Sequence, residues 1–430
     1  MTTLTSFSDQ QVHDFLAGMV TFCLVAWGLY LMLRWLRLTR PELAIGAPIA
    51  VAFGIRVLAA FGVSSTGVAA SLRGGDEVGF FLASKAISTT PFFGPDWTHV
   101  LTTKLYEFVF ATQIGALGST QTVLRISQAG IAVAGLVLLA VAVYELAGRR
   151  AALIVSWVIA FDPANIFFST LLHKEPNMLL AGGLVAFGGA CMWKRARLQY
   201  LWPITLGCLI ATATRPYAGW FLIAAGAAIT LHVGLRMRGE GARSLTLVAL
   251  VIMLGAISAP TVLKASTHES LSTLQASQSA NVSDSSNLKL EAVDFSTRGA
   301  IITNLPQRIR DVVTRPYPWQ LGNTSQQFGL LGTIFAWTVF WILGLELWRA
   351  RGHIMERAGP LIYTGLFLLI AYSLSAGNAG TAFRYRTHIV ALALCSLVVL
   401  RELRTNPDAI RTPSPAAPRT ERAAATAIPA

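Results

Sequence analysis

Two adjacent carboxylates, Asp76 and Glu77, follow a pair of glycines in the stretch SLRGGDEVGFF at residues 71–81. They come just after an apolar run, so we expect them close to a membrane surface. A partly desolvated carboxylate there could accept a proton from an attacking hydroxyl group, and the glycines would let the backbone approach a ligand. The alternative is a helix start, because Asp is a favourable N-cap and Glu is favourable in a first turn. One residue can serve both roles.

A second cluster, His173, Lys174 and Glu175, lies between two apolar runs and is followed by Pro176, which favours a first helical turn. Charged residues are ordinary in a tight membrane hairpin, which is the simpler interpretation. A lysine beside a carboxylate can also bind a phosphate group and position a second group or a divalent ion. His173 alone does not predict a metal site. Glu175 is therefore a candidate catalytic residue, and His173 and Lys174 are candidates for substrate binding.

Three arginines lie on the side of the predicted bundle that is otherwise poor in cations: Arg215 in ATATRPYAGW, and Arg384 and Arg386 in GNAGTAFRYRTHIV. Snorkelling toward lipid headgroups would explain them. Arginine forks also match phosphate oxygens, so a clamp for a lipid-linked phosphate is the sharper hypothesis. Arg56 lies inside an apolar run, where an unpaired charge costs at least about 2.5 kcal/mol. It must face protein or a polar cavity, with Asp162 as a candidate partner.

The composition is that of an integral membrane protein. Of the 430 residues, 54% are hydrophobic and 13% are charged, against roughly 25% charged in an average soluble protein. The net charge is +13, but the basic residues form short clusters between apolar runs, which favours membrane lipids over nucleic acid as partners. Walker A, HExxH and strand-associated GxGxxG patterns are missing. ATP-driven transport, zinc proteolysis and a Rossmann unit therefore have no support.

The apolar runs predict an all-α, polytopic membrane bundle over residues 1–405. A helix needs about 20 apolar residues to cross a bilayer. About eleven runs qualify, centred near residues 25, 54, 136, 160, 185, 206, 226, 254, 338, 367 and 394. We interpret the moderately apolar residues 100–118 as an interfacial helix, because counting them as a span would move every later basic cluster to the other side.

With this count the basic clusters fall on one face, which the positive-inside rule assigns to the cytoplasm. The N-terminus is then outside the plasma membrane, and residues 406–430 form a disordered cytoplasmic tail. Long outside loops cover residues 65–125, with interfacial helices, and residues 264–325. The acidic and basic clusters described above then gather at the outer face, where both loops could cover a site.

The order of these motifs resembles the multispanning GT-C glycosyltransferases, and most closely bacterial members linked to surface-polysaccharide synthesis. The motifs are the acidic pair, the later Glu175, the TRP at residues 214–216 and the RYR at residues 384–386. The resemblance covers roughly residues 45–402. It implies an inverting transfer of a sugar from a polyprenyl-phosphate carrier at the outer membrane face. Asp76 would be the base, with Glu77 as its substitute, and Lys174, Arg215 or Arg384 would hold the carrier phosphate.

Some members of that family also use a divalent metal such as Mg or Mn, but this sequence offers no evident ligand set. Residues 15–35 add a helix before the acidic loop, and no separate soluble C-terminal domain is evident, which favours a glycan or lipid acceptor over a protein. Two alternatives stay open. One is a polysaccharide polymerase or ligase that acts on polyprenyl-diphosphate-linked repeat units. The other is a lipid-linked-sugar transporter or flippase, with Arg56 and Asp162 along its pathway.

Overall fold

The computed structural model describes residues 9–66, 76–92, 94–236, 288–322 and 324–406, together with isolated positions between 243 and 279. Within these residues the chain is helical and forms no β-strand, apart from one isolated bridge between Lys289 and Asn378. This confirms the predicted all-α, polytopic bundle. Of the tail predicted to be disordered, residues 406–430, all but Asn406 lie outside the described residues, as does most of the second outside loop before residue 288.

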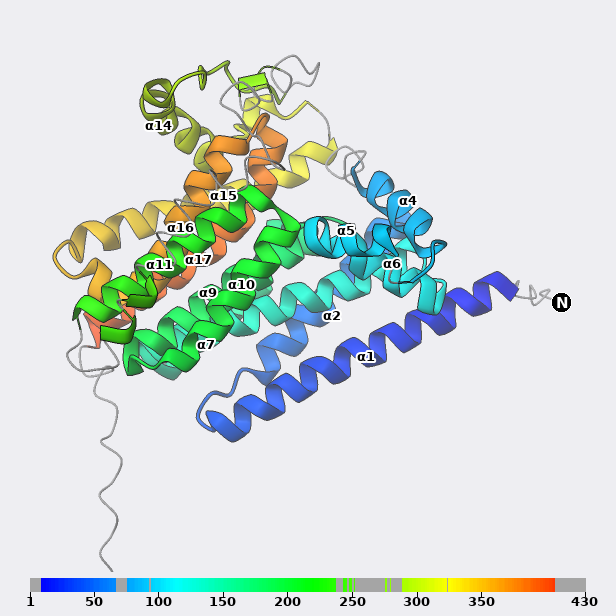
Figure 1. Cartoon of the computed structure of the whole chain (residues 1–430), viewed down its shortest axis with the longest axis horizontal. Helices are drawn as coiled ribbons and strands as arrows, with labels where there is room; N and C mark the ends of the chain where they lie inside the picture. The colour runs from blue at the N-terminus through cyan, green and yellow to red at the C-terminus, as the bar shows by residue number, and fades with distance from the viewer. Residues whose placement is uncertain are drawn as a thin grey trace, which may run out of the picture.

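Long helices lie side by side in Figure 1, with α14 above one end of the bundle and the shorter α4, α5 and α6 beside that end. The helices are α1 (Asp9–Thr39), α2 (Gly46–Thr66), α4 (Asp76–Ser88), α5 (Pro95–Thr103), α6 (Leu105–Leu117), α7 (Gln121–Ala160), α8 (Pro163–Ser169), α9 (Glu175–Arg195), α10 (Leu201–Thr214), α11 (Pro216–Arg236), α14 (Arg298–Thr314), α15 (Thr324–Arg349), α16 (Ile354–Ser375) and α17 (Ala379–Thr405).

The number of candidate spans differs from the predicted eleven. By length and composition, eight described helices could cross a membrane: α1, α2, α7, α9, α11, α15, α16 and α17. The run near residue 136 falls in α7, and the run near residue 160 begins in α7 and continues into α8. The run near residue 206 forms α10, whose 14 residues are fewer than the roughly 20 that a span needs. The run near residue 254 lies outside the described residues.

Gly148 divides α7 into two helical segments, because its φ of 83° and ψ of −175° interrupt the helix. A positive φ suits glycine, which has no Cβ to clash. Before this point, Glu145 pairs with Arg40, which follows α1. After it, the carbonyl oxygen of Ile159 lies 3.5 Å from Arg56 Nη2, halfway along α2. The second segment therefore turns back along the bundle, and it forms the first half of the predicted run near residue 160.

Residues 100–118 do not form one spanning helix. Lys104, with φ −142° and ψ 56°, separates α5 from α6, which have 9 and 13 residues. Each is shorter than the roughly 20 residues that a span needs. Together with α4 they form a group of short helices at one end of the bundle (Figure 1), in the arrangement that the interfacial interpretation expects.

A close crossing of α7 and α9 forms the middle of the bundle. A Cβ on Gly183 would lie 2.8 Å from the carbonyl oxygen of Gly135, so glycine at both positions lets the two backbones approach. Nearly all of α9 is enclosed by other helices, whereas most of α1 faces outward at the edge of the bundle (Figure 1). The first turn of α9, at Glu175, is therefore held on a well-packed element.

One end of the bundle collects ion pairs between arginines and carboxylates. They join Arg40 and Arg195 to Glu145, and Arg349 and Arg404 to Glu346. A hydrogen bond from Trp193 Nε1 to the carbonyl oxygen of Glu356 ties the end of α9 to the start of α16 at the same end. We call this the arginine-rich end. It brings together members of basic clusters that are far apart in the sequence.

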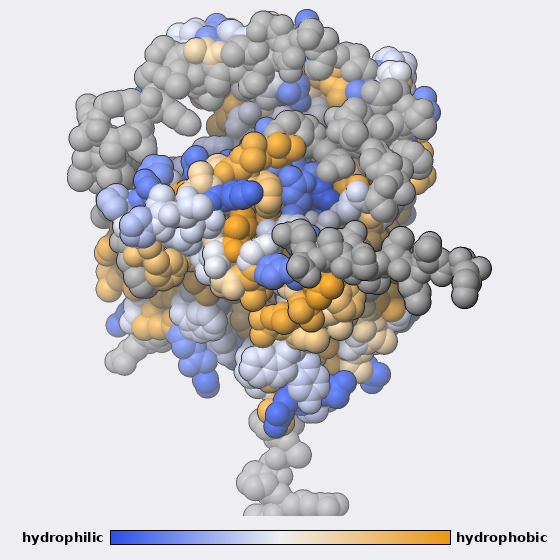
Figure 2. All heavy atoms as spheres, turned by 90° about the vertical axis from the view of Figure 1, so that its right-hand side faces the viewer, coloured by the Kyte–Doolittle hydropathy of each residue, from blue (hydrophilic) through white to orange (hydrophobic). Residues whose placement is uncertain are grey.

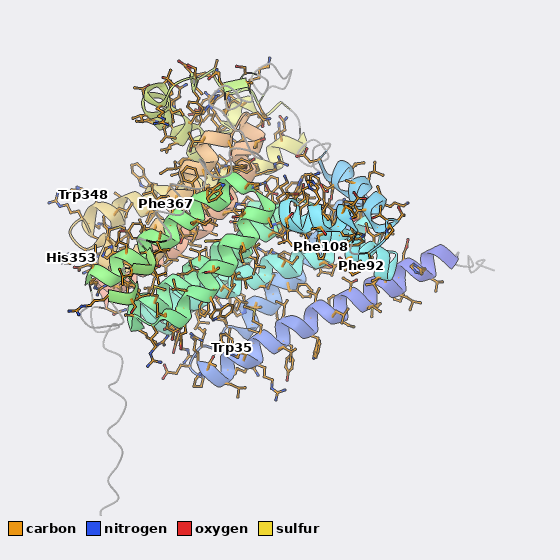
Figure 3. The ribbon with its side chains drawn as sticks, viewed as in Figure 1. Trp35, Phe92, Phe108, Trp348, His353 and Phe367 are labelled. Atoms are coloured by element: carbon orange, nitrogen blue, oxygen red, sulfur yellow. The ribbon has the colours of Figure 1, made fainter. Side chains whose placement is uncertain are left out.

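Aromatic side chains mark both ends of the bundle. In Figure 3, Trp35 and Trp348 lie toward the arginine-rich end, and Phe92 and Phe108 lie toward the opposite end. Tryptophan is typical of the membrane–water interface. Figure 2 shows hydrophobic residues interspersed with hydrophilic ones over the middle of one face, and hydrophilic residues at its lower end. The eight apolar helices are those of a multi-pass membrane protein.

Candidate functional site

A pocket of about 630 Å³ lies at the end of the bundle opposite the arginine-rich end. Its walls come from α4, α5, the start of α9, the α10–α11 junction and the start of α17. Six of the nine predicted site residues line it: Asp76, His173, Lys174, Glu175, Arg215 and Arg384. The other lining residues are Phe80, His99, Thr103, Lys104, Tyr106, Thr214, Pro216, Tyr217 and Tyr385. Short clusters distributed along most of the chain thus meet in one place.

Asp76 and Arg384, 308 residues apart in sequence, form an ion pair at the mouth of the pocket. Arg384 Nη1 donates to Asp76 Oδ2 at 2.8 Å and also lies 3.4 Å from His173 Nδ1. Burial alone would raise the pKa of Asp76, but the hydrogen bond and positive charge of Arg384 outweigh it and lower that pKa. Asp76 is therefore ionised at neutral pH, and with 51% of its side chain exposed it is accessible to a ligand.

Glu175 and Arg215 form a second, more buried pair, in which Arg215 Nη2 donates to Glu175 Oε1 at 2.6 Å. Glu175 begins α9, and Arg215 lies in extended backbone between α10 and α11, where Pro216 starts the next helix. The Arg215 guanidinium carbon lies 4.3 Å from the centre of the Tyr385 ring, a cation–π contact that orients it. The pair is electrically balanced before any ligand arrives.

Lys174 is the cation of the pocket with no such balance. Its Nζ lies 4.8 Å from the centre of the Tyr106 ring and 5.5 Å from that of Phe80. In the part of the chain that the structure describes, no carboxylate oxygen lies within 4.0 Å of it. Burial, followed by repulsion from Arg215, lowers the pKa of Lys174 to about 8. An anionic ligand beside Lys174 would stabilise the charged form of its ammonium group, which burial and Arg215 disfavour.

The α5–α6 wall contributes residues that the sequence did not single out for the site. Lys104 Nζ lies 3.4 Å from Glu107 Oε1, and the Tyr106 hydroxyl donates to the same oxygen at 3.0 Å. Burial raises the pKa of Tyr106, so its phenol stays protonated. The sequence signal was present, since Lys104 and Glu107 share one helical turn in residues 100–118. Only the packing of α6 against α4 brings them to the pocket.

Glu77 does not line the pocket. Its Oε1 accepts from Arg125 Nε at 2.8 Å and from the backbone N–H of Leu172 at 3.2 Å, and the side chain is only 1% exposed. It therefore joins the first turn of α4 to α7 and to the loop that carries Lys174. This placement suits a residue that positions the pocket, rather than the substitute base predicted from the sequence.

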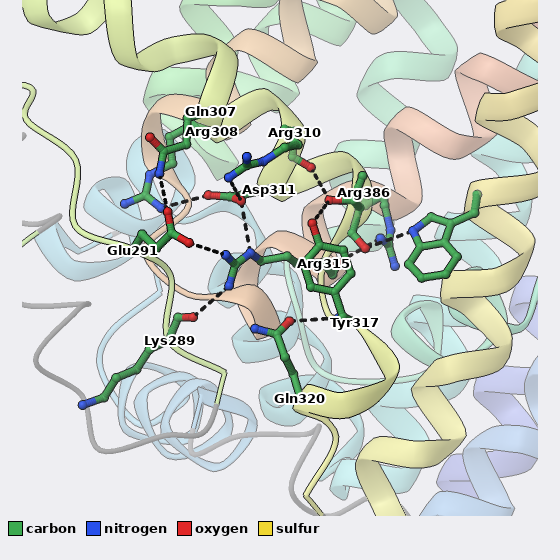
Figure 4. Close-up of polar contacts among 12 residues, drawn as sticks. Lys289, Glu291, Gln307, Arg308, Arg310, Asp311, Arg315, Tyr317, Gln320 and Arg386 are labelled. Atoms are coloured by element: carbon green, nitrogen blue, oxygen red, sulfur yellow. Dashed lines mark hydrogen bonds and ion pairs between the residues drawn. The ribbon is translucent and has the colours of Figure 1, made fainter.

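Arg386 also lies outside the pocket, two residues after Arg384. Its Nη1 donates to the carbonyl oxygen of Arg315 at 2.8 Å, and its Nη2 donates to Thr333 Oγ1 at 2.9 Å. Figure 4 shows this contact next to the ion pair between Arg315 and Asp311. Arg386 thus fastens the segment that follows α14 to α15 and α17, and the structure does not bring it to the predicted phosphate clamp.

Arg56 is fully buried and is engaged by protein groups. Its Nε donates to Ser169 Oγ at 2.9 Å and its Nη2 donates to Asn165 Oδ1 at 2.6 Å. Asp162, the partner suggested by the sequence, caps α8 by accepting from the backbone N–H groups of Ala164 and Asn165. Arg56 therefore holds α2 against α8 and does not line the pocket.

The pocket does not present a ready metal centre. The described part of the chain contains no group of three or more His, Cys, Asp or Glu residues placed to hold a metal ion. The two carboxylates of the pocket, Asp76 and Glu175, are each bound to an arginine. The donor set thus does not fit a divalent ion such as Mg or Mn, and the metal dependence implied by the family resemblance stays a prediction.

Taken as chemistry, the pocket offers a cation without a carboxylate partner, Lys174, close to an ionised and accessible carboxylate, Asp76. Such a site can bind an anionic group and accept a proton beside it. The functional argument rests on this geometry, because comparisons with models of known protein families, with curated proteins and with solved structures find no match to this chain.

Proposed function

We propose that this protein is a membrane glycosyltransferase with GT-C architecture. It transfers a sugar from a polyprenyl-phosphate-linked donor to a glycan or lipid acceptor and inverts the anomeric centre. The pocket faces the outside of the plasma membrane in this proposal, because the positive-inside rule assigns the arginine-rich end to the cytoplasm. The N-terminus is then outside and the C-terminus inside.

The observation that carries the proposal is the placement of Lys174. It is a cation without a carboxylate partner among the described residues, in a pocket at the end of an apolar bundle. The phosphate of a membrane-anchored carrier is an anion held at the same depth, and cationic side chains near a membrane surface attract such groups. Asp76 lines the same pocket, so a candidate base adjoins the candidate phosphate position.

The pocket residues supply the roles that the transfer needs. The acceptor hydroxyl gives its proton to Asp76 while its oxygen attacks C1 of the donor sugar. The bond between C1 and the carrier phosphate oxygen breaks, and its electron pair leaves with the phosphate. Negative charge grows on that phosphate, where Lys174 and Arg384 stabilise it. Attack from the face opposite the leaving phosphate inverts C1.

Arg384 connects phosphate binding to the base. Its Nη1 donates to Asp76 Oδ2 at 2.8 Å. A phosphate that engages this guanidinium competes with the carboxylate, because arginine forks match phosphate oxygens. Asp76 is then released from its ion pair when the donor is in place, which makes its carboxylate a better proton acceptor at that moment.

Lys104 favours a second candidate, a polymerase or ligase that uses polyprenyl-diphosphate-linked repeat units. It lines the pocket between α5 and α6, whereas Lys174 precedes α9 and Arg384 belongs to α17. Two phosphates would need more cations than one, and this distribution provides them. Farnesyl diphosphate would bind more tightly than farnesyl phosphate if this second candidate were correct.

A transporter or flippase has weaker support. Its main argument was Arg56 inside the membrane, but that guanidinium donates to Ser169, Asn165 and two backbone carbonyl oxygens. Its hydrogen-bonding groups are thus used to hold helices together. The polar residues of the described pocket instead gather at one end of the bundle, as a site for chemistry at one membrane face requires.

The direct test uses the full-length protein in lipid nanodiscs with a panel of labelled polyprenyl-phosphoryl sugars and crude cell-envelope acceptors. We expect transfer of label together with release of polyprenyl phosphate. Turnover of diphosphate-linked oligosaccharides alone would favour the polymerase or ligase. Movement of labelled carrier across proteoliposomes without a covalent product would favour the flippase. Failure of every carrier lipid to bind would reject all three.

A further inference from the structure

Three buried polar atoms of residues that line the pocket have no hydrogen-bond partner among the described residues: His173 Nε2, Glu175 Oε2 and Arg215 Nη1. Their side chains are at most 5% exposed, and all three residues line the pocket. Buried polar groups almost always have a partner, and each exception needs an explanation. Three exceptions around one pocket indicate a position for a bound polar group.

The three atoms present both donors and an acceptor. Arg215 Nη1 can only donate, and Glu175 Oε2 can only accept while the carboxylate is ionised. Arg384 Nη1 lies 3.4 Å from His173 Nδ1 and must be the donor of that contact, which places the ring proton on Nε2. Burial lowers the pKa of His173 to about 4, so the ring is neutral at pH 7. His173 Nε2–H is therefore a donor.

This set suits hydroxyl groups better than a phosphate. A hydroxyl both donates and accepts, whereas an ionised phosphate only accepts. Arg215 and Glu175 already balance each other at 2.6 Å, so an anion placed here would meet a carboxylate oxygen without net attraction. Lys174, with no carboxylate within 4.0 Å among the described residues, attracts an anion without that opposition.

We infer that His173, Glu175 and Arg215 form a subsite for adjacent hydroxyl groups of the donor sugar, separate from the phosphate position at Lys174 and Arg384. The ligand class is a neutral pyranose or furanose that carries at least two neighbouring hydroxyls. This inference rests on the proposed function. It assigns Glu175 to sugar recognition rather than catalysis, and Arg215 to the sugar rather than to the phosphate.

The test compares two probes on the full-length protein in nanodiscs by calorimetry. Farnesyl phosphate carries the phosphate without a sugar. A panel of farnesyl-phosphoryl glucose, mannose, galactose and arabinose adds one. We expect at least one sugar probe to bind the wild type about tenfold more tightly than farnesyl phosphate, because a site built for hydroxyls discriminates against ligands that lack them.

Three variants then separate the subsites. Glu175→Gln should abolish the gain from the sugar, because the charge-assisted hydrogen bond is lost. Farnesyl phosphate should bind at least as tightly as it does to the wild type, because Arg215 loses its carboxylate partner. His173→Phe should remove most of the same gain, and it leaves no buried charge without a partner. It therefore remains informative if Glu175→Gln does not fold. Lys174→Gln should show the reverse pattern, with farnesyl phosphate binding reduced and the ratio between probes preserved.

The outcomes distinguish the inference from the function on which it rests. If farnesyl phosphate binds but no sugar probe binds more tightly, the three atoms hold ordered water only, and the inference is wrong while the phosphate site stands. Equal weakening of both probes by His173→Phe would also reject the sugar subsite. If farnesyl phosphate itself does not bind the wild type, the proposed function fails first.

Discussion

The two ends of the bundle use the same chemistry in different ways. At the arginine-rich end, Glu145 receives two arginines, Arg40 Nη2 at 2.6 Å on Oε1 and Arg195 Nη2 at 3.0 Å on Oε2. At the pocket end, Glu175 receives only Arg215, on one oxygen, and its second oxygen has no partner among the described residues. Both carboxylate oxygens of Glu145 are thus paired with arginines, whereas only one oxygen of Glu175 is paired among the described residues.

Buried ion pairs in this chain are therefore of two kinds. A fully satisfied network fixes structure, whereas a partly satisfied one in a low-dielectric interior is costly unless a ligand completes it. The pocket combines the half-used Glu175 with Lys174, which has no carboxylate partner in the described part of the chain. Variants at the two ends should therefore differ in kind: those at the pocket should change binding and turnover, and those at the other end only stability.

The largest effect is expected at Asp76. Asp76→Asn keeps the size of the side chain but removes the proton acceptor, so kcat should fall about 100- to 10,000-fold, the usual contribution of general base catalysis. Donor binding should not weaken, because Asp76 competes with the phosphate for Arg384 in the proposed mechanism. Initial rates with the best donor of the panel, and calorimetry with farnesyl phosphate, measure the two quantities separately.

Unchanged turnover in Asp76→Asn would remove Asp76 as the base. A matched control is Asp96→Asn, on the neighbouring helix α5, whose side chain does not line the pocket. It should retain wild-type kcat. A similar loss of kcat in both variants would mean that the short helices α4 and α5 were disturbed as a unit. The loss could then not be assigned to the Asp76 carboxylate, and the pocket end would no longer differ from the arginine-rich end in catalysis.

Helical geometry explains which predicted residues reach the pocket. Successive residues in an α-helix point about 100° apart, so Asp76 and Glu77 cannot both face it, and Glu77 instead meets Arg125 on α7. Residues two apart point about 200° apart, which turns Arg386 away when Arg384 enters the pocket. Topology predicted that these clusters meet at one face. Which residue of each cluster enters the pocket depends on how each helix is rotated about its own axis, and the sequence alone does not give that rotation.

Other features depend on tertiary contacts that no local pattern carries. The apolar run near residue 206 contains enough hydrophobic residues for a span, but α10 ends at Thr214 after 14 residues, and this places Arg215 at the pocket. Tyr106 belongs to no motif in the sequence, yet the centre of its ring lies 4.8 Å from Lys174 Nζ. Both outcomes depend on where neighbouring helices pack, which the sequence of one segment does not determine.

The next effect concerns stability at the pocket end. Glu77→Gln removes the partner of Arg125 and leaves a buried charge, so the free energy of unfolding should fall by about 3 kcal/mol. Thermal unfolding in detergent measures this loss. The double variant Glu77→Gln, Arg125→Gln should be less destabilised than the sum of the two single variants. Strict additivity would show that the 2.8 Å pair contributes little and that Glu77 does not position the pocket.

Lys174→Gln should weaken farnesyl phosphate binding by about 10- to 100-fold, the range expected for losing a charged hydrogen bond. Calorimetry on the full-length protein gives the ratio of dissociation constants. Lys85→Gln, an exposed lysine on α4 that does not line the pocket, is the matched control and should bind as the wild type does. Equal effects in the two variants would indicate a general attraction between surface charge and lipid rather than a phosphate position at Lys174.

A smaller effect is expected from pH. The pKa of Lys174 is lowered to about 8, so the side chain is charged below that pH and loses its proton above it. Bound phosphate favours the charged form, and binding should therefore weaken by up to about tenfold between pH 7 and pH 9. Lys174→Gln should flatten this dependence. A pH profile that is the same with and without Lys174 would assign the titration to another group.

The smallest effect on function is expected at the arginine-rich end, where Glu346 pairs with Arg349 at 3.1 Å and Arg404 at 2.9 Å. Both arginines are well exposed, 49% and 39%, and solvent weakens such pairs. Glu346→Gln should therefore destabilise the protein less than Glu77→Gln does and should leave kcat and farnesyl phosphate binding within about twofold of wild type. Thermal unfolding and the same kinetic assay supply both numbers. A large loss of turnover without a loss of stability would show that the two ends are coupled, and the saturated network could then no longer be treated as purely structural.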